Sequence, residues 1–172
     1  MERFWRRAHG WAPADAADLL AAARLDRQVS FTHTLSDYLG PFSTDEAEAR
    51  LILGYVTLRS LCEGVLKLFF AVWWNDYRRE VTAAKDKKGI IKSPGTVGFE
   101  QLIALYVKRV GPHHKLFLRR IQQRGNAIHH FTDAAIGSQE ELLGDIEQFL
   151  RFLLAVNARL PYPDDDFNPA RA

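Results

Sequence analysis

The stretch LILGYVTLRSLCEGVLKLFFAVWW, residues 51–74, decides the fold, because it is the most apolar run of the chain. It contains three charged residues, Arg59, Glu63 and Lys67. Charges at this spacing oppose a membrane-spanning helix and favour a long helix in a protein core. Glu63 and Lys67 stand four positions apart, so we expect them to pair on the helix surface.

Helical patterns extend outward from this run in both directions. Its own periodicity continues over about residues 44–84, as one long helix or as two with a kink near Gly64. A segment rich in Lys and Gly, 85–95, is typical of an exposed loop. The expected helices cover residues 14–26, 44–84, 99–110, 113–131 and 138–160.

Two pairs of residues have the spacing of a capping box, in which a Ser and a Glu three positions later satisfy each other's backbone N–H groups. They are Ser43 with Glu46 and Ser138 with Glu141. Each pair predicts the beginning of a helix.

The patterns together predict an all-α protein, a bundle of four to five helices in a single domain over residues 1–172. No stretch shows the alternation of a convincing set of strands. The Pro- and Asp-rich tail, residues 161–172, is expected to be irregular.

Composition limits the possible functions. The formal net charge is +2, so a site for a polyanion must be a local patch. The single cysteine, Cys62, excludes an intramolecular disulfide and is expected to be a buried thiol. No signal peptide is recognised in residues 1–11. These features predict a cytoplasmic protein that does not contact a membrane.

The segment RGNAIHH, residues 124–130, is the densest cluster of functional side chains. On a helix with about 100° per residue, Arg124 and His129 flank a buried stripe and His130 points toward solvent. The expected stripe consists of Leu118, Ile121, Gly125 and Ile128.

These residue types suit cleavage of an RNA phosphodiester. A histidine can move a proton near neutral pH, and Arg124 can hold a phosphate. Asn126 can orient a ring or bind a phosphate, and no metal or cofactor is needed. Arg120 stands one turn before Arg124, and with Arg119 it forms a basic strip that is a candidate RNA contact.

The cluster resembles the signature of the HEPN superfamily, small all-α domains in which Arg is followed after four to six residues by His. Arg124 and His129 fit the four-residue gap, and His130 fits the five-residue gap. The resemblance covers residues 44–160. It implies a metal-independent endoribonuclease, a toxin or defence effector that leaves a 2',3'-cyclic phosphate and a 5'-hydroxyl. It also implies a homodimer, with an antitoxin or defence-system partner protein.

Two positions depart from the family's pattern. Gly125 stands where the family often has Asn, and the Asn here is Asn126. Phe131 stands where one branch has a tyrosine that a partner nucleotidyltransferase adenylylates, so that mode of silencing cannot use this position.

Other interpretations of the cluster remain open. The domain can be a non-catalytic HEPN-like module that dimerises or binds a nucleotide or a partner, or Arg124 and His129 can simply tie a helix end to its neighbours. Either His129 or His130 can be the working histidine. A metal site with His113 and His114 is not expected, because neighbours in sequence rarely share one ligand geometry.

Overall fold

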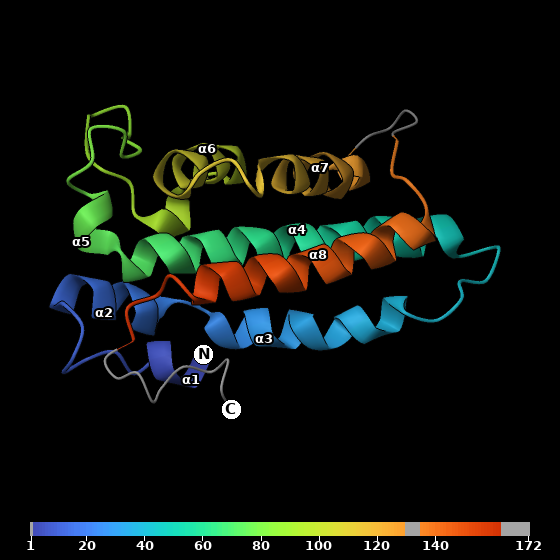
Figure 1. The fold of residues 1–172 in the computed structure, drawn as a ribbon, viewed down its shortest axis with the longest axis horizontal. Coiled ribbons are helices and arrows are strands. Elements are labelled where there is room, and N and C mark those ends of the chain that lie inside the picture. Colours follow the sequence, from blue (N-terminus) through green and yellow to red (C-terminus); the bar gives the residue numbers. More distant parts are fainter. Residues whose placement is uncertain (1, 130–134, 163–172) are drawn as a thin grey trace.

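The computed structural model describes residues 2–129 and 135–162, and in this part of the chain the protein is all-α (Figure 1). It contains eight α-helices and no strand in the described ranges, so the predicted class is confirmed and the count exceeds four to five. The helices are α1 Glu2–Trp5, α2 Ala14–Ala22, α3 Leu25–Thr34, α4 Ala47–Val72, α5 Trp74–Tyr77, α6 Phe99–Val110, α7 Lys115–Gly125 and α8 Gln139–Asn157. Short 3-10 helices are η1 Leu35–Tyr38, η2 Pro94–Thr96 and η3 Ala127–His129.

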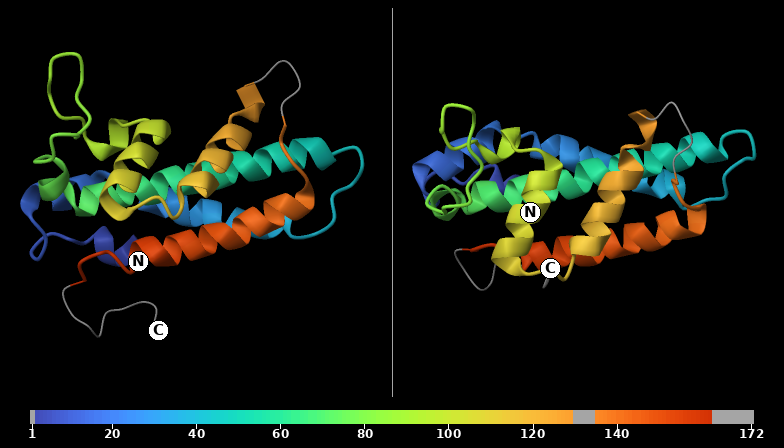
Figure 2. Two further views of the ribbon diagram at one scale, coloured as in Figure 1. Left: turned by 45° about the horizontal axis from the view of Figure 1, so that its top comes forward. Right: turned by 90° about the horizontal axis from the view of Figure 1, so that it is seen from above.

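Helix α4 is the centre of the bundle. It contacts α2 and α3 on one side, α6 and α7 on the other, and α8 runs beside it (Figures 1 and 2). Buried side chains recur three or four positions apart along α4, the pattern of a helix packed against a core. They include Tyr55, Leu58, Cys62, Leu66 and Phe69.

The core run forms one helix, but a shorter one than its periodicity predicts. α4 is continuous through Gly64, where the Gln28 side chain of α3 packs so closely that an added Cβ would lie 2.2 Å from its Oε1. The helix ends at Val72, because Trp73 leaves helical geometry with φ −90° and ψ 29°. The predicted ion pair is present, with Lys67 Nζ 2.7 Å from Glu63 Oε1.

The N-terminal boundaries also differ from the predicted ones. The expected helix over 14–26 is interrupted at Ala23, which is extended, so α2 and α3 are separate helices. The predicted capping box of Ser43 and Glu46 is wrong. Glu46 is itself the N-cap of α4 and receives no side-chain cap bond, and only the backbone carbonyl of Ser43 accepts from its N–H group, at 3.2 Å.

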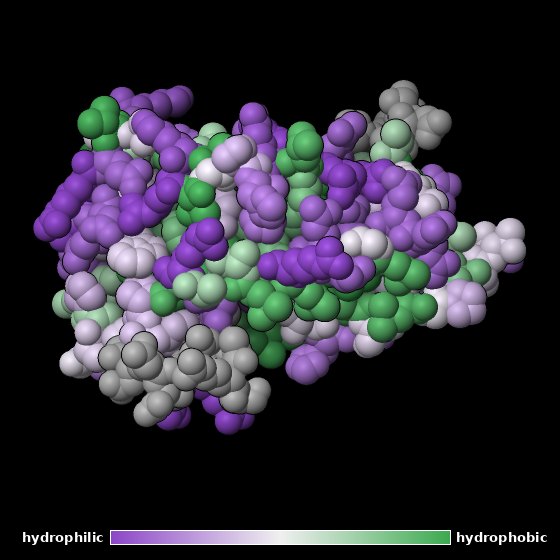
Figure 3. Space-filling model, viewed as in Figure 1, coloured by the Kyte–Doolittle hydropathy of each residue, from purple (hydrophilic) through white to green (hydrophobic). Residues whose placement is uncertain are grey.

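An apolar strip is exposed where α3 and α8 lie next to each other, visible as green surface in Figure 3. Val29 of α3 is 40% exposed, and Leu154 of α8 is 60% exposed. Beside the strip, a groove of about 240 Å³ opens between α3, α4 and α8. None of the helices in the described ranges is sufficiently long and apolar to cross a membrane.

Candidate functional site

The predicted helix over 113–131 ends early, at Gly125, and the chain continues as the 3-10 helix η3. The expected buried stripe is therefore correct as far as Gly125 and wrong at Ile128, which is 50% exposed. Ala127 is buried in its place, with 5% of its surface exposed. A 3-10 helix has three residues per turn, so side chains after Gly125 no longer follow the phase of α7.

Gly125 brings the end of α7 against α4. A Cβ at this position would lie 2.6 Å from Arg59 Cβ and 2.9 Å from the backbone oxygen of Tyr55. Only glycine allows this approach without displacing α4. The close contact carries Arg124, the preceding residue, to the side chain of Tyr55.

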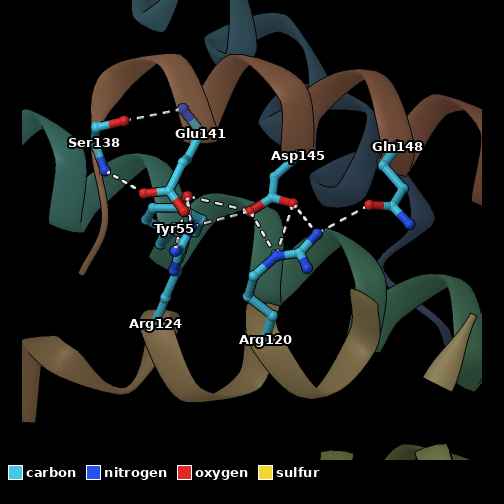
Figure 4. Close-up of polar contacts among 7 residues, drawn as sticks. All are labelled: Tyr55, Arg120, Arg124, Ser138, Glu141, Asp145 and Gln148. Carbon is cyan, nitrogen blue, oxygen red and sulfur yellow. Dashed lines mark hydrogen bonds and ion pairs between the residues drawn. The ribbon is translucent and has the colours of Figure 1, made fainter. Parts of the chain in front are cut away.

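Arg124 is held by three side chains, as Figure 4 shows. Its Nη1 donates to the Tyr55 hydroxyl at 2.5 Å and to Asp145 Oδ2 at 3.4 Å. Its Nη2 donates to Glu141 Oε1 at 2.6 Å. Only 13% of the Arg124 side chain is exposed. The direction of the guanidinium is therefore fixed by groups of the protein itself.

Asp145 is the buried centre of this network. Its side chain is 4% exposed, and it accepts from Arg120 Nε at 3.1 Å and Nη2 at 2.6 Å. The Tyr55 hydroxyl donates to it at 3.1 Å. Burial, and then the negative charge of Asp145, raises the pKa of Tyr55, so the hydroxyl remains a donor. A buried carboxylate needs such partners, because an unpaired charge away from water is costly.

Glu141 joins the network from the exposed side. The second predicted capping box is confirmed, because Ser138 Oγ accepts from the Glu141 N–H at 3.2 Å and Glu141 Oε2 accepts from the Ser138 N–H at 2.9 Å. The hydrogen bond from Arg124, and then that from the Ser138 backbone, lowers the pKa of Glu141. Its side chain is 51% exposed, so it holds Arg124 at the boundary with solvent.

These side chains surround a hollow of about 310 Å³ between α7 and α8, which we name the α7–α8 concavity. It is lined by Arg120, Arg124, Glu141, Gly144, Asp145 and Gln148. Gly144 leaves it open, because nothing lies within 4 Å of the place where its Cβ would be. The positive charges of the two arginines balance the negative charges of the two carboxylates, so the concavity is polar with a net charge close to zero.

The predicted site residues are distributed between this concavity and the following turn. Arg120 and Arg124 line the concavity together, whereas Arg119 pairs outside it with Glu100 at 2.8 Å. Asn126 is the C-cap of α7, and its carbonyl accepts from the His129 N–H at 3.0 Å.

Of the two candidate histidines, the structure describes only His129. His129 is exposed at the end of η3, and its ring makes no hydrogen bond to the described part of the chain. His130 lies outside the described residues.

Sequence reasoning did not find Tyr55 or Asp145, and it took Glu141 only as a cap. A signal for Asp145 was present, because it lies on the apolar stripe of α8. That stripe continues through Leu142, Ile146 and Phe149. An acid on a buried face predicts a basic partner on a neighbouring helix.

The described residues form neither a metal-binding cluster nor a reactive thiol site. Within residues 2–129 and 135–162, no three side chains of His, Cys, Asp or Glu are grouped to hold a metal ion. Cys62 is fully buried, and burial together with Asp145 raises the pKa of its thiol. A thiol of this kind is a core group and a poor nucleophile.

Comparisons with protein-family models, with curated proteins and with solved structures found no match to this chain.

Proposed function

We propose that the protein is a metal-independent endoribonuclease of the HEPN type, with Arg124 and His129 as its principal site residues. One observation carries the proposal: Arg124 is fixed at the edge of a polar concavity, and His129 lies exposed on the turn that begins directly after the same helix. The resemblance of residues 124–130 to the HEPN signature supports the same assignment.

Arg124 would hold the scissile phosphate. Its guanidinium is planar, permanently charged and able to donate two parallel hydrogen bonds to phosphate oxygens. Tyr55 and Asp145 fix its direction, so less conformational freedom is lost when substrate binds. As the attack proceeds, negative charge grows on the phosphorane, and a positioned arginine stabilises that charge. Arg120, one turn earlier in the same concavity, would add a second positive charge near this phosphate.

His129 would move the proton. In this reaction the 2'-oxygen of the ribose attacks phosphorus, the bond to the 5'-oxygen breaks, and a 2',3'-cyclic phosphate and a 5'-hydroxyl result. The histidine removes the proton of the 2'-hydroxyl or donates one to the leaving 5'-oxygen. His130 is the alternative histidine for this role, and Asn126 would orient the turn that carries His129.

The resemblance to the HEPN superfamily also implies a biological setting. The protein would act in the cytoplasm as a toxin or defence effector, as a homodimer in which two motifs face each other, under control of a partner protein. The apolar strip along α3 and α8 supports a protein contact, because exposed patches of this kind mark interaction surfaces.

A second candidate function is a non-catalytic module that dimerises or holds a nucleotide or a partner. A specific observation favours it: Arg124 is only 13% exposed, and Tyr55, Asp145 and Glu141 already accept from it. In this case the arginine would serve the stability of the bundle.

The test is cleavage of a mixed RNA pool in the presence of EDTA. The variants are Arg124→Lys, His129→Ala and His130→Ala, with His33→Ala, an exposed histidine on α3, as the matched control. We expect cutting by the wild type and the control and loss in Arg124→Lys and His129→Ala. Loss in His130→Ala alone among the histidine variants would move the role to His130. Absence of cutting by a folded wild type would favour the module.

A further inference from the structure

We infer that the α7–α8 concavity binds one phosphate of an RNA backbone and that Glu141 is the internal carboxylate which this phosphate displaces from Arg124. The inference rests on the proposed function and adds a regulatory step to it. In the resting protein Glu141 occupies the position that the phosphate takes in the complex.

The two carboxylates on Arg124 differ in their freedom to leave. Asp145 is 4% exposed and accepts from Tyr55, Arg120 and Arg124, so its departure would break several hydrogen bonds at once and remove the buried counter-charge of Arg124. Glu141 is 51% exposed and reaches Arg124 through one hydrogen bond of 2.6 Å. Its charge can return to water when the side chain rotates outward. Glu141 is therefore the exchangeable ligand of Arg124.

Helix α8 keeps part of its cap when Glu141 turns away. The bond from the Glu141 backbone N–H to Ser138 Oγ does not involve the carboxylate. Only the bond from the Ser138 N–H to Glu141 Oε2 is lost. The first turn of α8 can therefore remain in place while the side chain moves.

The charge left behind matches one phosphodiester. Without Glu141, the concavity contains Arg120, Arg124 and Asp145, a net charge of +1. A phosphodiester group carries one negative charge, so it restores the balance that Glu141 provided. The guanidinium donors that it would meet are already oriented by Tyr55 and Asp145.

The concavity also has room for the phosphate. Its volume is about 310 Å³, against about 30 Å³ for one molecule of liquid water. Gly144 has no side chain to fill the concavity, and no atom lies within 4 Å of the position that a Cβ would take there. Gln148 accepts from Arg120 Nη2 at 2.9 Å through its carbonyl, and its amide nitrogen is a further donor at the edge.

The experiment compares Glu141→Gln with Glu140→Gln. Both residues are exposed acids in the first turn of α8, so each change removes one charge from the same helix end, but only Glu141 contacts Arg124. Glutamine at 141 also keeps a carbonyl for the Ser138 N–H. The probe is a single-stranded RNA with every 2'-hydroxyl methylated, which cannot undergo cleavage by 2'-oxygen attack. Its binding is followed by fluorescence anisotropy at several salt concentrations.

We expect Glu141→Gln to bind the probe about tenfold more tightly than wild type, as loss of a competing charge-assisted hydrogen bond predicts. Glu140→Gln should bind within about twofold of wild type. Glu140 makes no ion pair within the described ranges, and such an exposed charge acts on the probe only through screened, long-range repulsion. A third variant, Gly144→Leu, should abolish binding without unfolding α8, because its side chain enters the open concavity.

Each other outcome overturns the inference. If Glu141→Gln and Glu140→Gln bind the probe with equal affinity, the effect is one of overall charge and not of the contact with Arg124. If folded Gly144→Leu binds the probe as tightly as wild type, the RNA binds outside the concavity. Absence of probe binding in both wild type and Glu141→Gln would overturn the assignment to RNA. If the predicted binding changes occur but the wild type cuts no RNA, the phosphate site stands and the proposed cleavage fails.

Discussion

The hydroxyl of Tyr55 donates a hydrogen bond of 3.1 Å to Asp145, a residue 90 positions later in the chain. This contact joins α4 to α8 inside the bundle, and Arg124 of α7 contacts both residues. Three helices therefore share one polar network at the place where the candidate site opens. The network has two effects, since it fixes Arg124 and it links the stability of the fold to the integrity of the site.

Replacement of Asp145 by Asn should strongly destabilise the protein. Arg124 would keep its low exposure but lose its buried counter-charge, and breaking a buried pair in this way costs about 3 kcal/mol or more. The free energy of unfolding from a urea titration measures the effect. The control is Glu147→Gln, whose partner Arg151 is 71% exposed, and which should change stability by at most about 1 kcal/mol. Equal losses in both variants would show that Asp145 is not a special counter-ion.

Two helical glycines should respond to alanine with opposite signs. At Gly125 the added Cβ meets Arg59 and the backbone of Tyr55, so we expect a loss of about 1–3 kcal/mol as α7 is pushed from α4. At Gly144 the Cβ enters open space, so the higher helix propensity of alanine should stabilise the protein by up to about 1 kcal/mol. Thermal unfolding of both variants checks the pair. A stabilised Gly125→Ala would contradict the close packing of α7 against α4.

The two predicted capping boxes differ in the structure, and so should their serine variants. Ser138→Ala removes the acceptor of the Glu141 N–H and should cost about 1 kcal/mol of stability. Ser43→Ala removes no side-chain cap of α4 and should be neutral within about 0.5 kcal/mol. Denaturant titrations under identical conditions make the comparison. A larger loss of stability in Ser43→Ala than in Ser138→Ala would contradict the finding that only Ser138 caps a helix with its side chain.

Stability should decrease with acidity because of His114. Burial, with the nearby charges of His113 and Arg159, lowers the pKa of His114 from its ordinary value near 6.5. Below pH 6.5 the unfolded chain therefore binds this proton more readily than the folded protein does. Stability that is present above pH 6.5 is then lost as the pH falls toward the lowered value.

The variant His114→Gln should flatten this dependence. The measurement is the free energy of unfolding of both proteins between about pH 7.5 and pH 5, a range that begins above the ordinary histidine pKa. Parallel curves for variant and wild type would exclude His114 as the source of the slope.

Much of the fold followed from local patterns, and its exceptions depend on turns and helix contacts that those patterns do not contain. The apolar stripe of residues 51–74 indicated the central helix, because the apolar residues of a buried helix face recur every three or four positions in the sequence. Ser43–Glu46 and Ser138–Glu141 have the same spacing, yet only the second pair forms a box, because spacing does not fix the turn that precedes the helix. The end of α7 at Gly125 depends on contact with α4, which the periodicity of α7 does not contain.

The candidate site was predictable in part for a similar reason. Arg124 was found because it lies in the polar cluster 124–130, and Arg120 because it stands one turn before Arg124 on the same helix. Tyr55 was missed because it is 69 positions from Arg124, and Asp145 because it is 21 positions away on another helix. Contacts of this kind are set by how helices pack, and a single sequence records them only as isolated polar residues on apolar faces.

The central place of α4 also has a consequence for synthesis. A ribosome completes α4 at Val72 but reaches the beginning of α8 only at Gln139, an interval of roughly 3–13 s at 5–20 residues per second. Until then Gly54 lacks Leu142, the side chain that packs on it, and the apolar flank of α4 stays uncovered. The nascent chain should therefore attract chaperones or aggregate most readily between these two points.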